Sequence, residues 1–316
     1  MKKVHLVLGS GGARGMAHIG VIDVLEETGH EIISITGCSM GAVVGGMYAA
    51  GYHAAYREWM LRLTKTLLFK ILDFTLTRQG FLKGERLFNL LKKVTGQQQI
   101  EDLRIPFVAV ATDMVQNKEV YYRSGDMYKA LRASIAIPGV FTPVLENGQF
   151  LVDGGVLNPL PLNLVQKNKD EFIIAVNVNG ASSPTMTTLE VKQEVTALWK
   201  WLNPLMQKEN KPKDLLPISE YSLRELLLSS YNMTQDRLAS YLLKTYPPDI
   251  LIEIPRNSCS TFEFYKARYM IDLGRNACTR ALEHNQQPGE EPELADPSHA
   301  QASVSITNIS VNHKKV

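Results

Sequence analysis

Hydrophobic and polar positions along the first fifty residues repeat one pattern twice. An apolar run is followed by a glycine-rich segment and then by apolar residues at helical spacing, which Gly29 and Gly51 bring to a stop. This pattern predicts a strand, a turn and a helix, twice over, at residues 3–8, 9–15, 16–27, 31–36, 37–41 and 42–50. Strands that alternate with helices at this spacing indicate a parallel sheet covered on both faces.

The remainder of the chain adds further strands and two segments of different character. Strand patterns recur at residues 107–112, 120–122, 150–152, 172–178 and 249–254. Residues 181–247 are mainly helical in pattern, which predicts a helical insertion. From about residue 286 apolar anchors become scarce, so we expect 286–316 to be a disordered tail and 3–285 to be the folded domain.

Composition and charge exclude several classes of protein. The chain has 316 residues, 45% of them hydrophobic, which suits a globular domain, and its 34 basic and 32 acidic residues provide no electrostatic footprint for nucleic acid. No eighteen-residue stretch is apolar and free of charge, so we expect no membrane span. The three cysteines cannot form an even disulfide framework, which favours a reducing compartment.

The run Gly37-Cys38-Ser39-Met40-Gly41 is the sharpest local signal for chemistry. A G-x-S-x-G run between a strand and a helix presents its serine at the carboxyl edge of the sheet, in the tight turn of a nucleophile elbow. The alternative interpretation is an ordinary helix start with Ser39 as its N-cap.

The run Gly9-Ser10-Gly11-Gly12-Ala13-Arg14-Gly15 after the first strand admits two functional interpretations. As a dinucleotide fingerprint it is incomplete, because Arg14 occupies the place of the third glycine and no acidic residue ends the second strand. As an oxyanion hole it would offer consecutive amides at a helix start. A plain tight turn is the third possibility.

A nucleophilic serine needs a base, and no histidine is well placed to serve as one. His18 lies on the first helix, and His284, His299 and His313 lie at or beyond the end of the last one. Asp153-Gly154-Gly155 follows an apolar strand and offers a carboxylate at a strand end, which would need burial to act as a base. Its alternative role is that of a turn aspartate. No motif for a metal site is present, and we expect no cofactor.

In combination, the glycine loop, the Ser39 elbow and Asp153-Gly154-Gly155, in this order and at these strand ends, resemble the patatin-like phospholipase family. The segment Ala133-Ser134-Ile135-Ala136-Ile137-Pro138-Gly139-Val140-Phe141 also resembles a characteristic part of that family. The resemblance covers roughly residues 3–178, and the strand near residue 252 and a helix over 262–282 would complete the domain.

The resemblance implies a three-layer α/β/α fold with a mainly parallel central sheet, and a Ser–Asp dyad in place of a triad. Ser39 would be the acylated nucleophile and Asp153 its base, while the amides of Gly11, Gly12 and Met40 would hold the oxyanion. Arg14 would either act directly or brace the glycine loop. The supporting glycines would be Gly9, Gly15, Gly37, Gly41, Gly154 and Gly155.

The implied function is that of a serine acyl hydrolase that cleaves lipid esters through an acyl-enzyme. An acyltransferase or thioesterase on the same dyad is the alternative, and a non-catalytic nucleotide-binding regulator is the third hypothesis. We expect a cytoplasmic protein with a lipid or acyl-ester substrate and transient contact with membrane surfaces, and no nucleic-acid partner. Residues 67–74 and 199–208 combine apolar side chains with lysines and could meet lipid, or pack against the domain or a partner subunit.

Overall fold

The computed structural model describes residues 2–73, 75, 80, 82–182 and 223–286. Its strands are Lys3–Leu8 (β1), Glu31–Cys38 (β2), Phe107–Asp113 (β3), Lys118–Tyr122 (β4), Val144–Glu146 (β5), Gln149–Asp153 (β6), Glu171–Gly180 (β7) and Ile250–Pro255 (β8). Its α-helices are Ala17–Glu27 (α1), Met40–Ala49 (α2), His53–Leu61 (α3), Lys65–Ile71 (α4), Glu85–Thr95 (α5), Met127–Ser134 (α6), Leu223–Thr245 (α8) and Ala267–Gln286 (α9). Short 3-10 helices lie at Gly12–Met16 (η1), Ile100–Asp102 (η2), Gly154–Val156 (η3), Leu162–Leu164 (η4), Arg256–Ser258 (η6) and Phe264–Lys266 (η7).

The strands form one mixed sheet in the order β5-β6-β3-β2-β1-β7-β8, with β4 also paired to β3. The central strands β3, β2, β1, β7 and β8 are parallel, as the alternation of strands and helices predicts. The strands β4, β5 and β6 join antiparallel at one end of the sheet. The sequence pattern missed β5 because three residues are too few to show periodicity.

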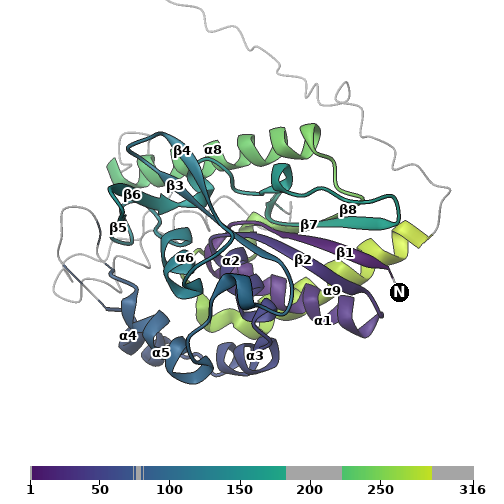
Figure 1. Ribbon diagram of the computed structural model, residues 1–316, viewed down its shortest axis with the longest axis horizontal. Helices are drawn as coiled ribbons and strands as arrows, with labels where there is room; N and C mark the ends of the chain where they lie inside the picture. The colour runs from purple at the N-terminus through teal and green to yellow at the C-terminus, as the bar shows by residue number, and fades with distance from the viewer. Residues whose placement is uncertain (1, 74, 76–79, 81, 183–222, 287–316) are drawn as a thin grey trace, which may run out of the picture.

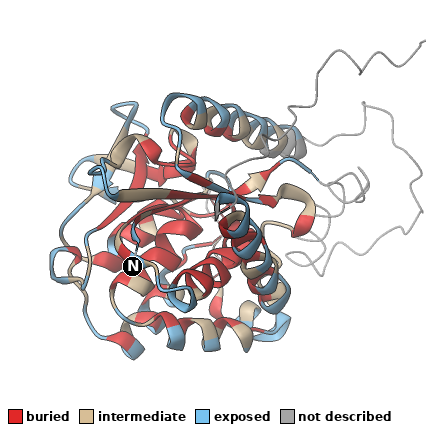
Figure 2. Ribbon diagram, turned by 90° about the vertical axis from the view of Figure 1, so that its right-hand side faces the viewer, coloured by how far each residue is buried: buried red, intermediate tan, exposed pale blue. Residues whose placement is uncertain are grey.

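Two layers of helices cover this sheet. In Figure 1, α8 lies on one face, and α1, α2 and α9 lie on the other. The larger core lies on the second face, where Leu6, Leu8 and Ile35 of the sheet pack against these helices. A smaller core lies beneath α8, where Ala239 and Leu242 join the sheet residues Val7 and Ala175. Figure 2 shows the strands and the inward sides of the helices as the buried part of the molecule. The architecture is therefore the three-layer α/β/α fold expected.

Element boundaries differ from the predictions by a few residues at helix starts. The first helix begins at Ala17, because η1 occupies the preceding glycine-rich turn. The second begins at Met40, two residues early, since β2 runs on to Cys38 and leaves only Ser39 between strand and helix. The last helix begins at Ala267, after the η7 turn.

The pairing register of β3 decides where the site forms. Cys38 at the end of β2 pairs with Val110, and Asp153 at the end of β6 pairs with the next residue, Ala111. Because β4 pairs with residues 109–113 of β3, β2 and β6 must both lie along the opposite edge of β3. The two strands run toward each other along that edge, so the residues at their carboxyl ends meet.

Candidate active site

Ser39 occupies the single-residue turn between β2 and α2, with φ of 55° and ψ of −124°. This backbone conformation is strained for a residue with a side chain and costs about 1–3 kcal/mol. Gly41 makes room for the turn, because a Cβ at that position would lie 2.2 Å from the carbonyl oxygen of Leu8. The serine therefore sits on a sharp elbow at the carboxyl edge of the sheet, as the G-x-S-x-G run predicts.

A second serine holds this elbow in place. The Ser39 amide donates to Ser134 Oγ at 2.9 Å, and the Ser134 hydroxyl donates to the carbonyl oxygen of Val110 at 2.7 Å. Ser134 is fully buried at the end of α6. The sequence assigns no role to this residue apart from its place in the segment that resembles the family.

Ser39 and Asp153 meet in a direct hydrogen bond, although 114 positions separate them in the sequence. Ser39 Oγ donates to Asp153 Oδ2 at 2.6 Å, and the Gly155 amide donates to Asp153 Oδ1 at 2.7 Å. Both side chains are buried. Burial raises the pKa of Asp153 from its ordinary value of 3.8 to about 7, against the lowering effect of these two hydrogen bonds. A carboxyl group with this pKa can take up and release a proton near neutral pH.

The glycine loop lies beside this pair and leaves some of its amides available. Its other amides are occupied: Gly9, Ser10 and Ala13 donate to the carbonyl oxygens of Val176, Pro159 and Thr261. Within the described residues, the amides of Gly11 and Gly12 donate none of these loop hydrogen bonds, although the Gly11 carbonyl oxygen accepts from the Arg14 amide at 3.2 Å. Both glycines line the same cavity as Ser39. Gly12 has φ of +56°, and a Cβ there would lie 2.5 Å from the Thr261 carbonyl oxygen.

The amide of Met40 belongs to the first turn of α2, where no preceding helical carbonyl can accept from it. It directly follows Ser39 in the chain. The amides of Gly11, Gly12 and Met40, which the resemblance implies for an oxyanion hole, thus belong to residues that line the cavities at Ser39.

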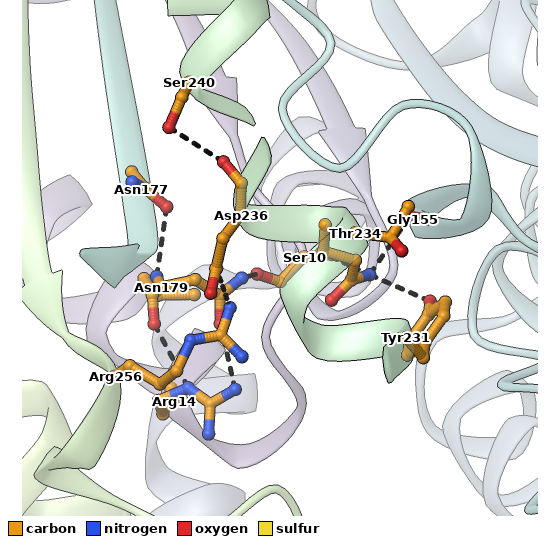
Figure 3. A network of polar contacts seen from close by, with 12 residues as sticks. Ser10, Arg14, Gly155, Asn177, Asn179, Tyr231, Thr234, Asp236, Ser240 and Arg256 are labelled. Carbon is orange, nitrogen blue, oxygen red and sulfur yellow. Dashed lines mark hydrogen bonds and ion pairs between the residues drawn. The ribbon is translucent and has the colours of Figure 1, made fainter. Parts of the chain in front are cut away.

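Arg14 is buried and takes part in a network of polar contacts with Asn179 (Figure 3). Its guanidinium donates to the carbonyl oxygens of Val178 and Cys259 at 3.1 and 2.9 Å, and to Asn179 Oδ1 at 2.9 Å. Asn179 Nδ2 in turn donates to the carbonyl oxygen of Ser10 at 2.6 Å. Of the two roles open for Arg14, these contacts are those of a brace that ties the loop to β7.

No histidine lines the cavities around Ser39 in the described part of the chain. His18 is fully buried, its Nε2 lies 2.9 Å from the Gly9 carbonyl oxygen, and burial lowers its pKa to about 4. It therefore packs behind the glycine loop as a neutral side chain. His284 lies in the last turn of α9, and His299 and His313 lie outside the described residues.

Two cavities meet at Ser39. The polar cavity, with about 650 Å³ of space, is lined among others by Ser10, Arg14, Ser39, Asp153, Tyr231 and Gln235. The apolar cavity, with about 750 Å³, is lined among others by Ser39, Val43, Met60, Leu68, Leu91 and Phe264. Asp153 lines the polar cavity and not the apolar one. The serine hydroxyl therefore stands at the junction of a polar and a hydrocarbon-lined space.

The two segments considered for lipid contact have different outcomes. Residues 65–71 form α4, whose Leu68 and Ile71 line the apolar cavity while Leu67 and Phe69 are exposed at 36% and 48%. Helix α4 therefore packs within the domain and also leaves two apolar side chains exposed, while its contact with lipid stays a prediction. The second segment, 199–208, lies outside the described residues.

Among the described residues, no group of three or more His, Cys, Asp or Glu side chains is arranged to hold a metal ion. None of the helices in this part of the chain has the length and apolar character needed to cross a membrane.

The chain is similar in sequence to a known protein family and to several known proteins. The family model for patatin-like phospholipases matches residues 6–165. An uncharacterized NTE family protein of Mycobacterium tuberculosis is 34% identical over 93% of this chain and 95% of its own length. Human patatin-like phospholipase domain-containing protein 6 is 32% identical over 66% of this chain and 16% of its own length. The crystal structure of VipD from Legionella pneumophila aligns with 90% of this chain and 67% of its own, at 13% identity and a TM-score of 0.43.

The matched residues 6–165 include the glycine loop, the Ser39 elbow, Ser134 and Asp153. On this match and on the identity to relatives, the chain belongs to the patatin-like phospholipase family.

Proposed function

We propose that the chain is a serine acyl hydrolase that cleaves carboxylic esters of lipids through Ser39 and Asp153. Membership of the family makes it a lipid ester hydrolase in general terms, and the proposal adds the residues and the steps. The observation that carries it is the 2.6 Å hydrogen bond from Ser39 Oγ to a buried carboxylate whose pKa burial raises to about 7.

In the first half-reaction, Asp153 accepts the hydroxyl proton as Ser39 Oγ attacks the ester carbonyl carbon. The amides of Gly11, Gly12 and Met40 stabilise the oxyanion, and each such donor is worth roughly 3 kcal/mol of barrier. The carbon–oxygen bond of the alcohol then breaks, and the proton passes from Asp153 to the departing oxygen. In the second half-reaction water replaces the alcohol, Asp153 repeats both transfers, and the fatty acid leaves.

The two cavities indicate where the acyl chain and the alcohol of the substrate bind. The apolar cavity extends from Ser39 between α2, α3 and α5 and suits an acyl chain, because its lining offers hydrocarbon and very few polar groups. The proton of the departing alcohol comes from Asp153, which lines only the polar cavity. The alcohol side of the ester therefore lies in the polar cavity.

The proposal is tested with Ser39→Ala and Asp153→Asn. Each variant is expected to fold and to lose p-nitrophenyl ester hydrolysis by at least about 1,000-fold, as removal of triad residues does elsewhere. Fluorophosphonate should label the wild-type protein on Ser39 and leave Ser39→Ala unlabelled. Hydrolysis near the wild-type rate by either variant would refute the dyad. Running the assay with glycerol as a competing acceptor measures how much acyl group is transferred and not hydrolysed.

A further inference from the structure

Helix α8 inserts two polar side chains into the active site, although it lies beyond the residues that the family model matches. Gln235 is buried, and its Nε2 lies 2.8 Å from Tyr231 Oη, 3.2 Å from the Gly155 carbonyl oxygen and 3.3 Å from Ser10 Oγ, three partners that Figure 3 labels. Of its two hydrogens, one is donated to Tyr231, the nearest acceptor, and the other is shared between Gly155 and Ser10. The amide thus links α8 to the glycine loop on one side and to the turn after Asp153 on the other.

The hydroxyl of Tyr231, a residue that lines the polar cavity, is available as a hydrogen-bond donor. Because it accepts from Gln235, its own proton is directed elsewhere, and among the described residues no acceptor takes it. Burial, together with the charges of Asp153 and Cys38, raises the pKa of Tyr231 above its ordinary value of 10. The phenol therefore stays protonated at every pH at which the site would work.

Tyr231 lines the cavity in which the proposed function places the departing oxygen. Ester cleavage leaves negative charge on the alcohol oxygen as the carbon–oxygen bond breaks, and a donor aimed at that oxygen lowers the barrier. The alcohol side lies in the polar cavity with Asp153, and Tyr231 lines the same cavity.

We propose that Tyr231 donates a hydrogen bond to the leaving-group oxygen during acylation, and that Gln235 is the positioning residue that orients its phenol. This inference rests on the proposed function. Asp153 delivers its proton to the alcohol as the bond to carbon breaks, and Tyr231 keeps its own proton and stabilises the charge that develops before that transfer is complete. Helix α8 thereby becomes the element that selects for the alcohol half of the substrate.

The test compares two esters of one fatty acid with different alcohols, a p-nitrophenyl ester and a glyceryl ester. The p-nitrophenolate anion is stable by itself and leaves without a hydrogen-bond donor on its oxygen. A glyceryl alkoxide is far more basic, and its departure depends on such a donor. Tyr231→Phe removes only the hydroxyl. We expect it to lower kcat/KM for the glyceryl ester roughly 10- to 100-fold, the range for a hydrogen bond to a charged group, and for the p-nitrophenyl ester by no more than about twofold.

Tyr241→Phe is the matched control, because Tyr241 lies on the same helix with a 65% exposed side chain. It should change neither rate. Gln235→Leu, like Tyr231→Phe, should lower kcat/KM for the glyceryl ester more than kcat/KM for the p-nitrophenyl ester.

Equal losses on both esters in Tyr231→Phe, or no loss on either, would overturn the inference while Ser39→Ala remains inactive and the proposed function stands. Hydrolysis by Ser39→Ala would instead overturn the proposed function, whatever Tyr231→Phe does.

Discussion

Burial of Asp153 should cost the folded protein stability at neutral and alkaline pH, and Asp153→Asn should recover it. The carboxyl group has 1% exposure, and its pKa moves from 3.8 to about 7 on folding. Because the folded state holds this proton more tightly than the unfolded state, the wild-type protein loses stability as the pH rises from about 4 to about 7. An amide at this position carries no charge and escapes that loss.

The interval from 3.8 to about 7 corresponds to about 4 kcal/mol in total, at about 1.4 kcal/mol per pH unit. Between pH 5 and pH 8, a range in which most proteins stay folded, the stability advantage of Asp153→Asn over the wild type should grow by about 3 kcal/mol. The amide preserves the shape of the carboxyl group, so packing around Ser39 changes little.

Urea unfolding of both proteins at pH 5, 6, 7 and 8 measures this difference from midpoints and slopes. Asp126→Asn provides a control without pH dependence in this range. Burial tends to raise the pKa of Asp126, but hydrogen bonds from Gln97 and from the amides at the start of α6 lower it overall from 3.8. Its stabilising contribution is fully present above the unfolded pKa and is lost only as the pH falls below about 4, so the stability gap between this variant and the wild type should stay constant from pH 5 to pH 8.

A stability gap between Asp153→Asn and the wild type that stays constant from pH 5 to pH 8 would refute the reasoning. It would mean that the carboxylate is as well solvated in the fold as in the unfolded chain, and that Asp153 is not tuned by burial.

Four further outcomes follow from the same structure. The kcat/KM of the wild type should rise about tenfold per pH unit below pH 7 and level off above it, since Asp153 must be ionised to accept a proton; a flat profile from pH 5 to pH 8 would contradict this. Ser39→Gly should have a free energy of unfolding about 1–2 kcal/mol higher than that of Ser39→Ala in denaturant titrations, because only glycine tolerates φ of 55° there without strain. Equal stability of the two variants would show that the elbow is relaxed. Gly20→Ala should lose about 1–3 kcal/mol or fail to accumulate, since its Cβ would lie 2.0 Å from the Ile271 carbonyl oxygen between α1 and α9; a calorimetric Tm equal to that of the wild type would count against this packing. Leu91→Trp should reduce hydrolysis of long-chain p-nitrophenyl esters and spare the butyrate ester, because the larger ring shortens the apolar cavity, and parallel losses on both esters would remove this cavity as the acyl site.

The chemistry carried by short segments could be predicted from the sequence. The strand, glycine loop and helix at 3–27, and the strand, elbow and helix around Ser39, are specified by local periodicity and by glycines that the tight turns require. The order of these motifs was sufficient to suggest the family. A local pattern works here because strand ends, turns and helix starts each depend on a few neighbouring residues.

Tertiary structure alone decided how the site is assembled. The register of β3 brings the ends of β2 and β6 together, so Ser39 meets Asp153, and long-range packing buries the pair and raises the pKa of the carboxyl group. The sequence left the role of Arg14 open, and the structure ties its guanidinium to Val178 and Asn179 of β7.

Tyr231 and Gln235 escaped the sequence entirely, and Ser134 entered it only within the segment that resembles the family, because ordinary polar residues on helices acquire a role only from what folding places opposite them. Helix α8 reads in the sequence as part of an insertion, yet its Tyr231 and Gln235 line the same polar cavity as Asp153. Burial and strand register depend on contacts across the whole chain, and no window of neighbouring residues encodes them.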